Sequence, residues 1–177
     1  MQMIRDFREE IDALYGTYLD ATTGFIKMSE RFQNEAPGAS LLYGKGPPDD
    51  KNVVLLHKVT FTELLERNKE NGQNFRVMGH LLIISVYQLW EDFYRGEISH
   101  LLGNKVKNDL KSDFFYELGI IRHAITHNQG NRISKFDKLK RLKFLDKEYV
   151  HPLKDDVQKL IEEFNKELTE IEKSLPN

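Results

Sequence analysis

Apolar residues recur along most of the chain in steps of three and four, which places them on one face of an α-helix. A first helix is predicted over residues 3–33, with a possible kink or break near Gly24 because glycine lowers helix propensity. Its apolar stripe consists of Ile4, Phe7, Ile11, Leu14 and Tyr18. Residues 36–48 concentrate proline and glycine, so they predict a loop.

The segment 49–70 allows two interpretations. The apolar run at residues 53–56 fits a short buried strand, whereas residues 62–67 favour a helix, and a helix throughout is the preferred prediction. The next helix is predicted over residues 73–102 and is apolar nearly all round in its middle, which is typical of the centre of a bundle. Its apolar stretch, residues 77–90, is shorter than the roughly 20 residues that cross a bilayer, so no membrane span is expected.

Two further helices follow towards the C-terminus. One is predicted over residues 108–127, with a core stripe in steps of three and four, and it ends at the turn-forming residues 128–131. The last has Pro152 in its first turn, where a missing N–H costs little. Five helices with short connections predict an all-α fold: an up-and-down bundle of four to five helices forming a single domain over residues 1–177.

The composition is that of an ordinary globular protein, with 40% hydrophobic and 31% charged residues. The chain has no cysteine, which excludes disulfides, thiolate metal sites and cysteine nucleophiles and fits a reducing compartment. Its first ten residues lack the apolar run of a signal peptide, so a cytoplasmic protein is expected. Because the net charge is −2, any nucleic-acid binding requires a local basic patch.

One segment carries residues suited to chemistry. The end of the helix 108–127 reads Arg122-His123-Ala124-Ile125-Thr126-His127. Arginine presents a permanently charged, planar fork that matches phosphate oxygens, and histidine gives and accepts protons near neutral pH. Cleavage of RNA by its own 2′-hydroxyl requires both functions, since protons must move and charge on the phosphate must be stabilised.

This segment resembles the HEPN superfamily, the higher eukaryotes and prokaryotes nucleotide-binding domains. Its ribonuclease members carry Arg, then usually Asn, Asp or His, then a few mostly apolar residues, then His, as residues 122–127 do. Asn128 and the central segment 89–95, which contains Glu91 and Asp92, also look similar to the family's surroundings of the site. The two predicted helices that carry these segments, residues 73–102 and 108–127, cover about a third of the chain.

The resemblance implies a homodimer in which two motifs form a composite site that cuts RNA without metal or cofactor. Arg122 would hold the scissile phosphate, and His127 would act on the 2′-hydroxyl or the leaving oxygen, leaving a 2′,3′-cyclic phosphate. His123 is included in the catalytic set, with an orienting role favoured over direct catalysis, and Glu91, Asp92 and Asn128 are supporting residues. A role as a toxin or antiviral-defence effector, with an antitoxin or a nucleotidyltransferase as partner, follows from the family alone.

Other interpretations remain open for the same residues. Arg122 and His127 would then be surface residues at a helix end, in a non-catalytic RNA-binding or nucleotide-binding module, a regulatory module or a dimerisation scaffold. His123 and His127 have the i, i+4 spacing of metal ligands, but Ala124 stands where a zinc-protease motif has its Glu. A metal site is therefore not predicted.

A basic stretch with interleaved aromatic residues follows the motif directly. Residues 128–152 contain seven Lys or Arg against three Asp or Glu. The predicted RNA-binding residues are Arg132, Lys135, Lys138, Lys140, Arg141 and Lys143. The alternative is a charged amphipathic helix that partly buries Leu139, Leu142 and Leu145.

Overall fold

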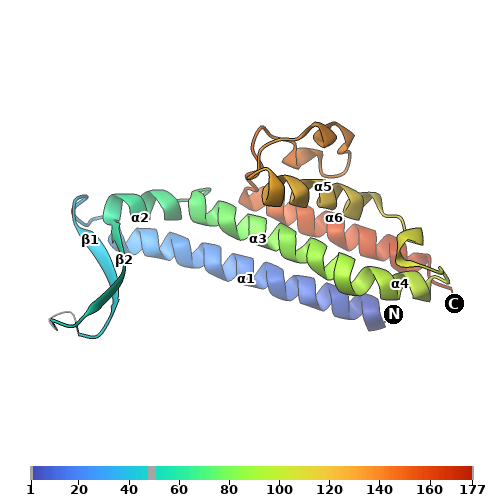
Figure 1. Ribbon diagram of the computed structural model, residues 1–177, viewed down its shortest axis with the longest axis horizontal. Helices are drawn as coiled ribbons and strands as arrows, with labels where there is room; N and C mark the ends of the chain where they lie inside the picture. The colour runs from blue at the N-terminus through green and yellow to red at the C-terminus, as the bar shows by residue number, and fades with distance from the viewer. Residues whose placement is uncertain (1, 48–50, 177) are drawn as a thin grey trace. The chain divides into compact units, whose positions relative to one another are not determined.

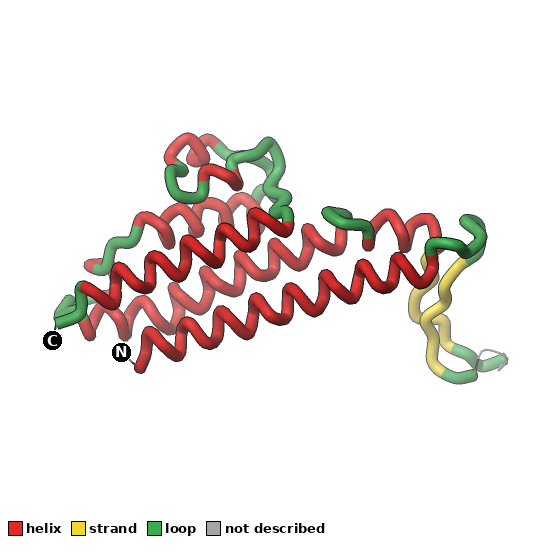
Figure 2. Tube along the Cα trace, turned by 180° about the vertical axis from the view of Figure 1, so that it is seen from behind, coloured by secondary structure: helices red, strands yellow, loops and turns green. Residues whose placement is uncertain are grey.

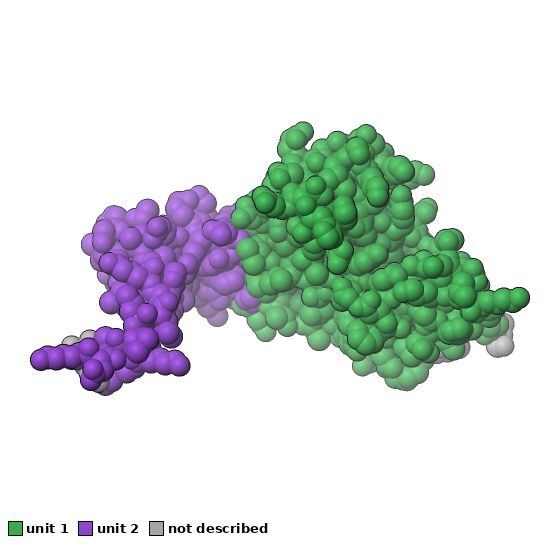
Figure 3. Space-filling model, viewed as in Figure 1, with its two compact units in different colours: residues 1–20, 76–177 green, residues 21–75 purple. Residues whose placement is uncertain are grey.

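The computed structural model describes residues 2–47 and 51–176 of the chain. The chain forms two compact units (Figure 3). Unit 1 consists of residues 1–20 and 76–177, and unit 2 consists of residues 21–75. The motif and the basic stretch both lie in unit 1.

The helices of unit 1 run side by side (Figures 1 and 2). They comprise the first part of α1 (Gln2–Phe32), most of α3 (Gln73–Leu89), α4 (Arg95–Leu101), α5 (Asp113–His127) and α6 (Lys154–Lys173). The predicted helical bundle is thus confirmed for this unit, and α1 continues through Gly24 without a break. Within the described ranges, no helix has the length and the apolarity needed to cross a membrane.

The start of α5 differs from the prediction by five residues. Ser112 ends the preceding extended segment, and its hydroxyl accepts the N–H of Phe115 at 3.1 Å, which satisfies a free donor in the first helical turn. Residues 107–109 form only a short 3-10 turn. The predicted helix 108–127 therefore begins at Asp113, and its end at His127 is confirmed.

Stacked aromatic rings form the centre of the unit 1 core. Phe7 of α1 is fully buried and stacks on Tyr94, with ring centroids 4.2 Å apart. Trp90 stacks on Phe115 of α5 at 3.8 Å with nearly parallel planes. Such pairs add to the large apolar area that each ring buries, so they fix α5 against the helix that carries Trp90.

A π-helical turn at Trp90–Tyr94 separates α3 from α4. The N–H of Arg95 donates to the carbonyl of Trp90, five residues earlier, instead of the residue four positions back. The turn buries Trp90 and Tyr94 while leaving the Phe93 ring 64% exposed. Turns of this kind occur frequently at functional sites, and this one borders the pocket described below.

Unit 2 contains an antiparallel hairpin of β1 (Ser40–Lys45) and β2 (Val54–Thr60), followed by α2 (Phe61–Asn68) (Figure 2). The predicted loop over 36–48 and the helix over 49–70 are therefore wrong at residues 40–45 and 54–60. The predicted loop end at Pro48 and helix start at Asp49 lie outside the described residues.

The hairpin has one pair of apolar residues that face each other across the strands, near its junction with α2. Leu41 pairs with Val59, and the register shifts at Tyr43 and Gly44, so the period-two alternation of a regular strand is interrupted. Thr60 then starts α2: its hydroxyl accepts the N–H of Glu63, and the Glu63 carboxylate accepts the N–H of Thr60.

Candidate functional site on helix α5

The motif occupies the last two turns of α5. Ile121 and Ala124 face the core, so Arg122 lies at its edge, half-buried, while His123 and His127 are exposed. After His127 the helix ends because the N–H groups of Asn128 and Gly130 both donate to the carbonyl of Ala124, at 3.0 and 2.9 Å. Gly130 adopts a φ of 86°, a left-handed conformation that glycine accepts readily.

Arg122 is positioned by an aromatic ring of the neighbouring helix. Its guanidinium carbon lies 5.9 Å from the centroid of the Tyr87 ring, and its buried Nε has no hydrogen-bond partner. Within the described part of the chain, Arg122 forms no ion pair with a carboxylate, unlike Arg95 or Arg141. The guanidinium therefore keeps its charge available for an external anion.

Gly119 allows Tyr87 to reach this position. A Cβ atom at Gly119 would lie 2.9 Å from the Tyr87 ring, closer than carbon atoms approach in proteins. The absence of a side chain at Gly119 thus lets the Tyr87 ring lie directly against α5, one turn before Arg122.

The two histidines of the motif contact each other. Their ring centroids are 4.7 Å apart, with 37° between the planes, as expected for residues one helical turn apart. His123 lines the pocket next to Arg122, and His127 lies outside it. Among the residues that the structure describes, no group of three or more His, Asp and Glu side chains could hold a metal ion.

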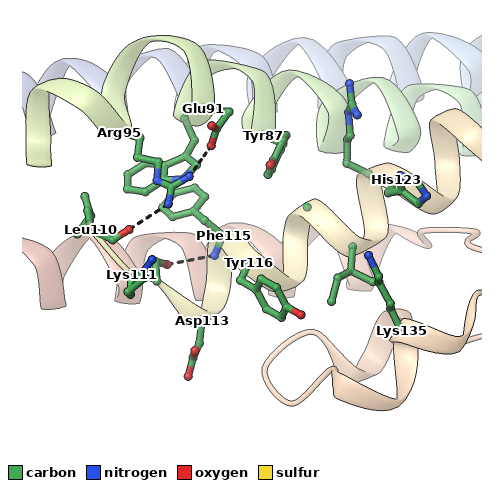
Figure 4. A pocket seen from close by; sticks show the side chains of 15 residues that line it. Tyr87, Glu91, Arg95, Leu110, Lys111, Asp113, Phe115, Tyr116, His123 and Lys135 are labelled. Atoms are coloured by element: carbon green, nitrogen blue, oxygen red, sulfur yellow. Dashed lines mark hydrogen bonds and ion pairs between the residues drawn. The ribbon is translucent and has the colours of Figure 1, made fainter. Parts of the chain in front are cut away.

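A pocket of about 640 Å³ lies between α5 and the helices α3 and α4 (Figure 4). In this view Glu91 and Arg95 lie at one end and His123 at the other. The aromatic lining residues are Tyr87, Trp90, Phe115 and Tyr116. The charged lining residues are Glu91, Arg95, Lys111, Asp113, Arg122 and Lys135. Four cations against two carboxylates make the pocket positive in a chain whose net charge is −2.

Of the two adjacent acidic residues, only Glu91 lines this pocket. Its carboxylate forms ion pairs with Arg95 and Lys107, both at 2.9 Å. Burial raises the pKa of Glu91, but the hydrogen bonds from Lys107 and Arg95 outweigh it and hold the pKa below its usual value. Asp92 is exposed and accepts a hydrogen bond from Gln88 outside the pocket.

The stretch that follows the motif is a folded loop with 3-10 turns at residues 134–138 and 143–145. Its apolar residues Phe136, Leu139, Leu142, Leu145 and Val150 are all buried. Leu139, Leu142 and Leu145 are thus almost fully buried, and they lie in this loop instead of in an amphipathic helix.

The loop is also attached to α3, because His80 forms a 2.6 Å hydrogen bond with the carbonyl of Val150. Burial is the main reason that the pKa of His80 lies below its usual value.

A buried carboxylate of α5 holds the middle of this loop. Glu117 is 2% exposed, and its two oxygens accept the backbone N–H groups of Lys140 and Leu142 at 2.9 and 2.8 Å. Glu117 is thus a structural anchor between the motif helix and the basic loop. No sequence pattern indicates this role, because the groups that Glu117 binds belong to the backbone.

The six predicted RNA-binding residues fall into two groups. Arg132 pairs with Asp137 and Asp146, Lys143 pairs with Asp146, and Arg141 pairs with acidic residues of α6. Lys135, Lys138 and Lys140 are exposed and form no ion pair within the described part of the chain. Of the six, only Lys135 also lines the pocket.

The carboxylates change the properties of the paired arginines. Asp146 and Asp137 raise the pKa of Arg132 above its usual value, and Arg132 and Lys143 lower the pKa of Asp146. Burial opposes the charge of Arg141, but hydrogen bonds to Glu163 and Glu167 outweigh it and raise its pKa. These guanidinium groups hold the loop together.

The chain matches no protein-family model, and no curated protein or solved structure is significantly similar to it.

Proposed function

We propose that the chain is a metal-independent endoribonuclease of the HEPN type. The observation that carries this proposal is the combination of Arg122, a half-buried guanidinium with no carboxylate partner, and the histidine pair His123 and His127 on the last turns of one helix. These groups supply phosphate binding and proton transfer beside a positive pocket.

In this reaction a histidine accepts the proton of the 2′-hydroxyl, whose oxygen forms a bond to phosphorus. The bond from phosphorus to the 5′-oxygen breaks, and a second proton is given to that oxygen. Arg122 stabilises the charge that develops on the phosphate. The products are a 2′,3′-cyclic phosphate and a 5′-hydroxyl.

A second subunit completes the site in this proposal. Arg122 and His127 are five residues apart, which rotates them by about 140° around the helix, and only Arg122 lines the pocket. A two-fold axis near the end of α5 would bring His127 of one subunit to Arg122 of the other. A role as a toxin or defence effector remains part of the same proposal.

The test measures cleavage of single-stranded RNA in excess EDTA. Arg122→Ala and His127→Ala should each lower the rate at least 100-fold, the usual effect of losing a phosphate-stabilising or proton-transferring group. Arg76→Ala and His100→Ala are matched controls: Arg76 also lies over a tyrosine ring, and His100 is also exposed in the last turn of a helix. Full activity of either motif variant, or activity abolished by EDTA, would contradict the proposal.

Mixing the two inactive variants tests the composite site. A heterodimer of Arg122→Ala and His127→Ala subunits contains one site with an intact arginine from one subunit and an intact histidine from the other. Activity should therefore reappear on mixing. A protein that sediments as a monomer and still cleaves RNA would refute the two-subunit arrangement.

A non-catalytic RNA-binding module is the second candidate, favoured by the position of His127 outside the pocket. It predicts RNA binding that depends on Arg122 without any cleavage by the wild-type protein.

A further inference from the structure

The pocket beside the motif extends well beyond the residues that cleavage requires. Arg122 and His123 line one end, and the rest of the lining reaches Asp113, the first residue of α5, and Lys111, two residues before it. Its volume of about 640 Å³ lies within the range of small-molecule sites. The space is thus large enough to hold a part of the substrate that does not react.

Tyr116 gives this space an aromatic surface. Its side chain is 54% exposed although it lines the pocket. Tyr116 and His123 are seven residues apart on the same face of α5, which separates them by roughly 10.5 Å along the helix. Gly119 and Ile120 lie between them on this side of the helix, where Ile120 lines the pocket and the Tyr87 ring lies against Gly119.

Two exposed lysines flank Tyr116 and belong to none of the ion pairs described above. In Figure 4, Lys111 lies on one side of Tyr116 and Lys135 on the other, near His123. Both are exposed, and neither forms an ion pair within the residues that the structure describes. The carboxylate of Glu91 in the same pocket is already neutralised by Arg95 and Lys107. Asp113 is the remaining carboxylate of the lining, so together with Lys111 and Lys135 it leaves a net charge of +1 around Tyr116.

We propose that this pocket is a nucleotide-binding subsite for single-stranded RNA, in which a base next to the cleaved bond stacks on Tyr116. Lys111 and Lys135 contact the phosphates on either side of that base. An exposed ring flanked by cations is the usual platform for an unpaired base, because stacking is largely independent of sequence and the cations follow the backbone. The identity of the ligand as RNA rests on the proposed function.

Binding is measured with a short, fluorescein-labelled 2′-O-methyl RNA, which has no free 2′-hydroxyl and therefore cannot be cut. Tyr116→Ala should weaken binding at least about fivefold, the lower limit for loss of one stacked base, and Tyr116→Phe should bind like the wild type. Phe93→Ala is the matched control, since the Phe93 side chain is also more than half exposed but lies outside this pocket. Lys111→Ala and Lys135→Ala should each reduce the slope of the logarithm of the binding constant against the logarithm of the salt concentration by about 0.7.

The subsite is refuted if Tyr116→Ala binds like the wild type, if Phe93→Ala weakens binding as much, or if the wild type does not bind. Cleavage of unmodified RNA separates this inference from the proposed function. If the wild-type protein cuts no RNA but binds it more tightly than Tyr116→Ala does, the subsite is supported and the nuclease is contradicted. If Tyr116→Ala cleaves RNA with the KM of the wild type and binds RNA as tightly, the nuclease is supported and the subsite is contradicted.

Discussion

Replacing Glu117 by alanine should destabilise the protein by about 3 kcal/mol. The carboxylate accepts two backbone N–H groups of the loop, and Leu142, one of the two donors, is fully buried. An unsatisfied buried N–H costs about 1–3 kcal/mol. The N–H of Lys140 is closer to solvent and can bind water instead, so its loss adds about 1 kcal/mol.

Urea unfolding followed by the helical circular dichroism signal measures this change. For a chain of this size, 3 kcal/mol corresponds to a fall in Tm of about 6–12 °C. Glu117→Gln keeps one acceptor oxygen and should lose roughly half as much stability. Glu148→Ala is the matched control, an exposed glutamate of the same loop that should change the free energy of unfolding by less than about 0.5 kcal/mol.

Amide hydrogen exchange shows where the stability is lost. In Glu117→Ala the amide of Leu142 should exchange faster than in the wild type by a larger factor than the amides of the core helices. The reasoning is refuted if Glu117→Ala unfolds within about 0.5 kcal/mol of the wild type and the Leu142 amide keeps its protection.

Three further changes test other parts of the site. Gly119→Ala should lower RNA cleavage at least about tenfold with little loss of stability, because the new Cβ displaces the far end of the Tyr87 ring; Gly96→Ala, at a helical glycine with open space around it, should have no effect on cleavage. Gly130→Ala should cost about 1–3 kcal/mol in urea unfolding because φ there is positive. Asp146 has a lowered pKa, so its stabilisation is complete above its unfolded pKa and is lost as the pH falls below about 4; Asp146→Asn should flatten the pH dependence of the unfolding midpoint in that range.

The helices of unit 1 could be predicted because their apolar residues follow the helical period and are buried where the period places them. Ile4, Phe7 and Ile11 of α1 are almost fully buried, as the stripe indicated. The hairpin could not be predicted in the same way. Its leucines and valines are largely exposed, so no burial pattern marks them, and the register shift at Tyr43 and Gly44 interrupts the alternation.

The loop after the motif shows a second limit of the sequence. Its buried residues at 136, 139, 142 and 145 are spaced by three, which a regular α-helix does not follow but 3-10 turns do. The groups that fix the loop, such as Glu117 and the acidic residues of α6, lie 22 or more residues away from their partners. Local patterns therefore predicted the positions of Arg122, His123 and His127 on their helix, and missed that Arg141 is bound by carboxylates of α6.

The π turn at Trp90–Tyr94 makes the length of this segment as important as its composition. The turn adds one residue to a helical repeat, so α4 is out of phase with an unbroken continuation of α3 by about 100°. This offset directs Ile98 into the core and Arg95 to the pocket. Because the turn fits one additional residue into a helical repeat, deleting one residue between Trp90 and Arg95 would restore an ordinary helix and leave Arg95 and Ile98 on their present faces. If the same residues formed an α-helix instead of the π turn, every face of α4 would rotate by about 100°, whereas a substitution of the exposed Phe93 leaves these faces unchanged.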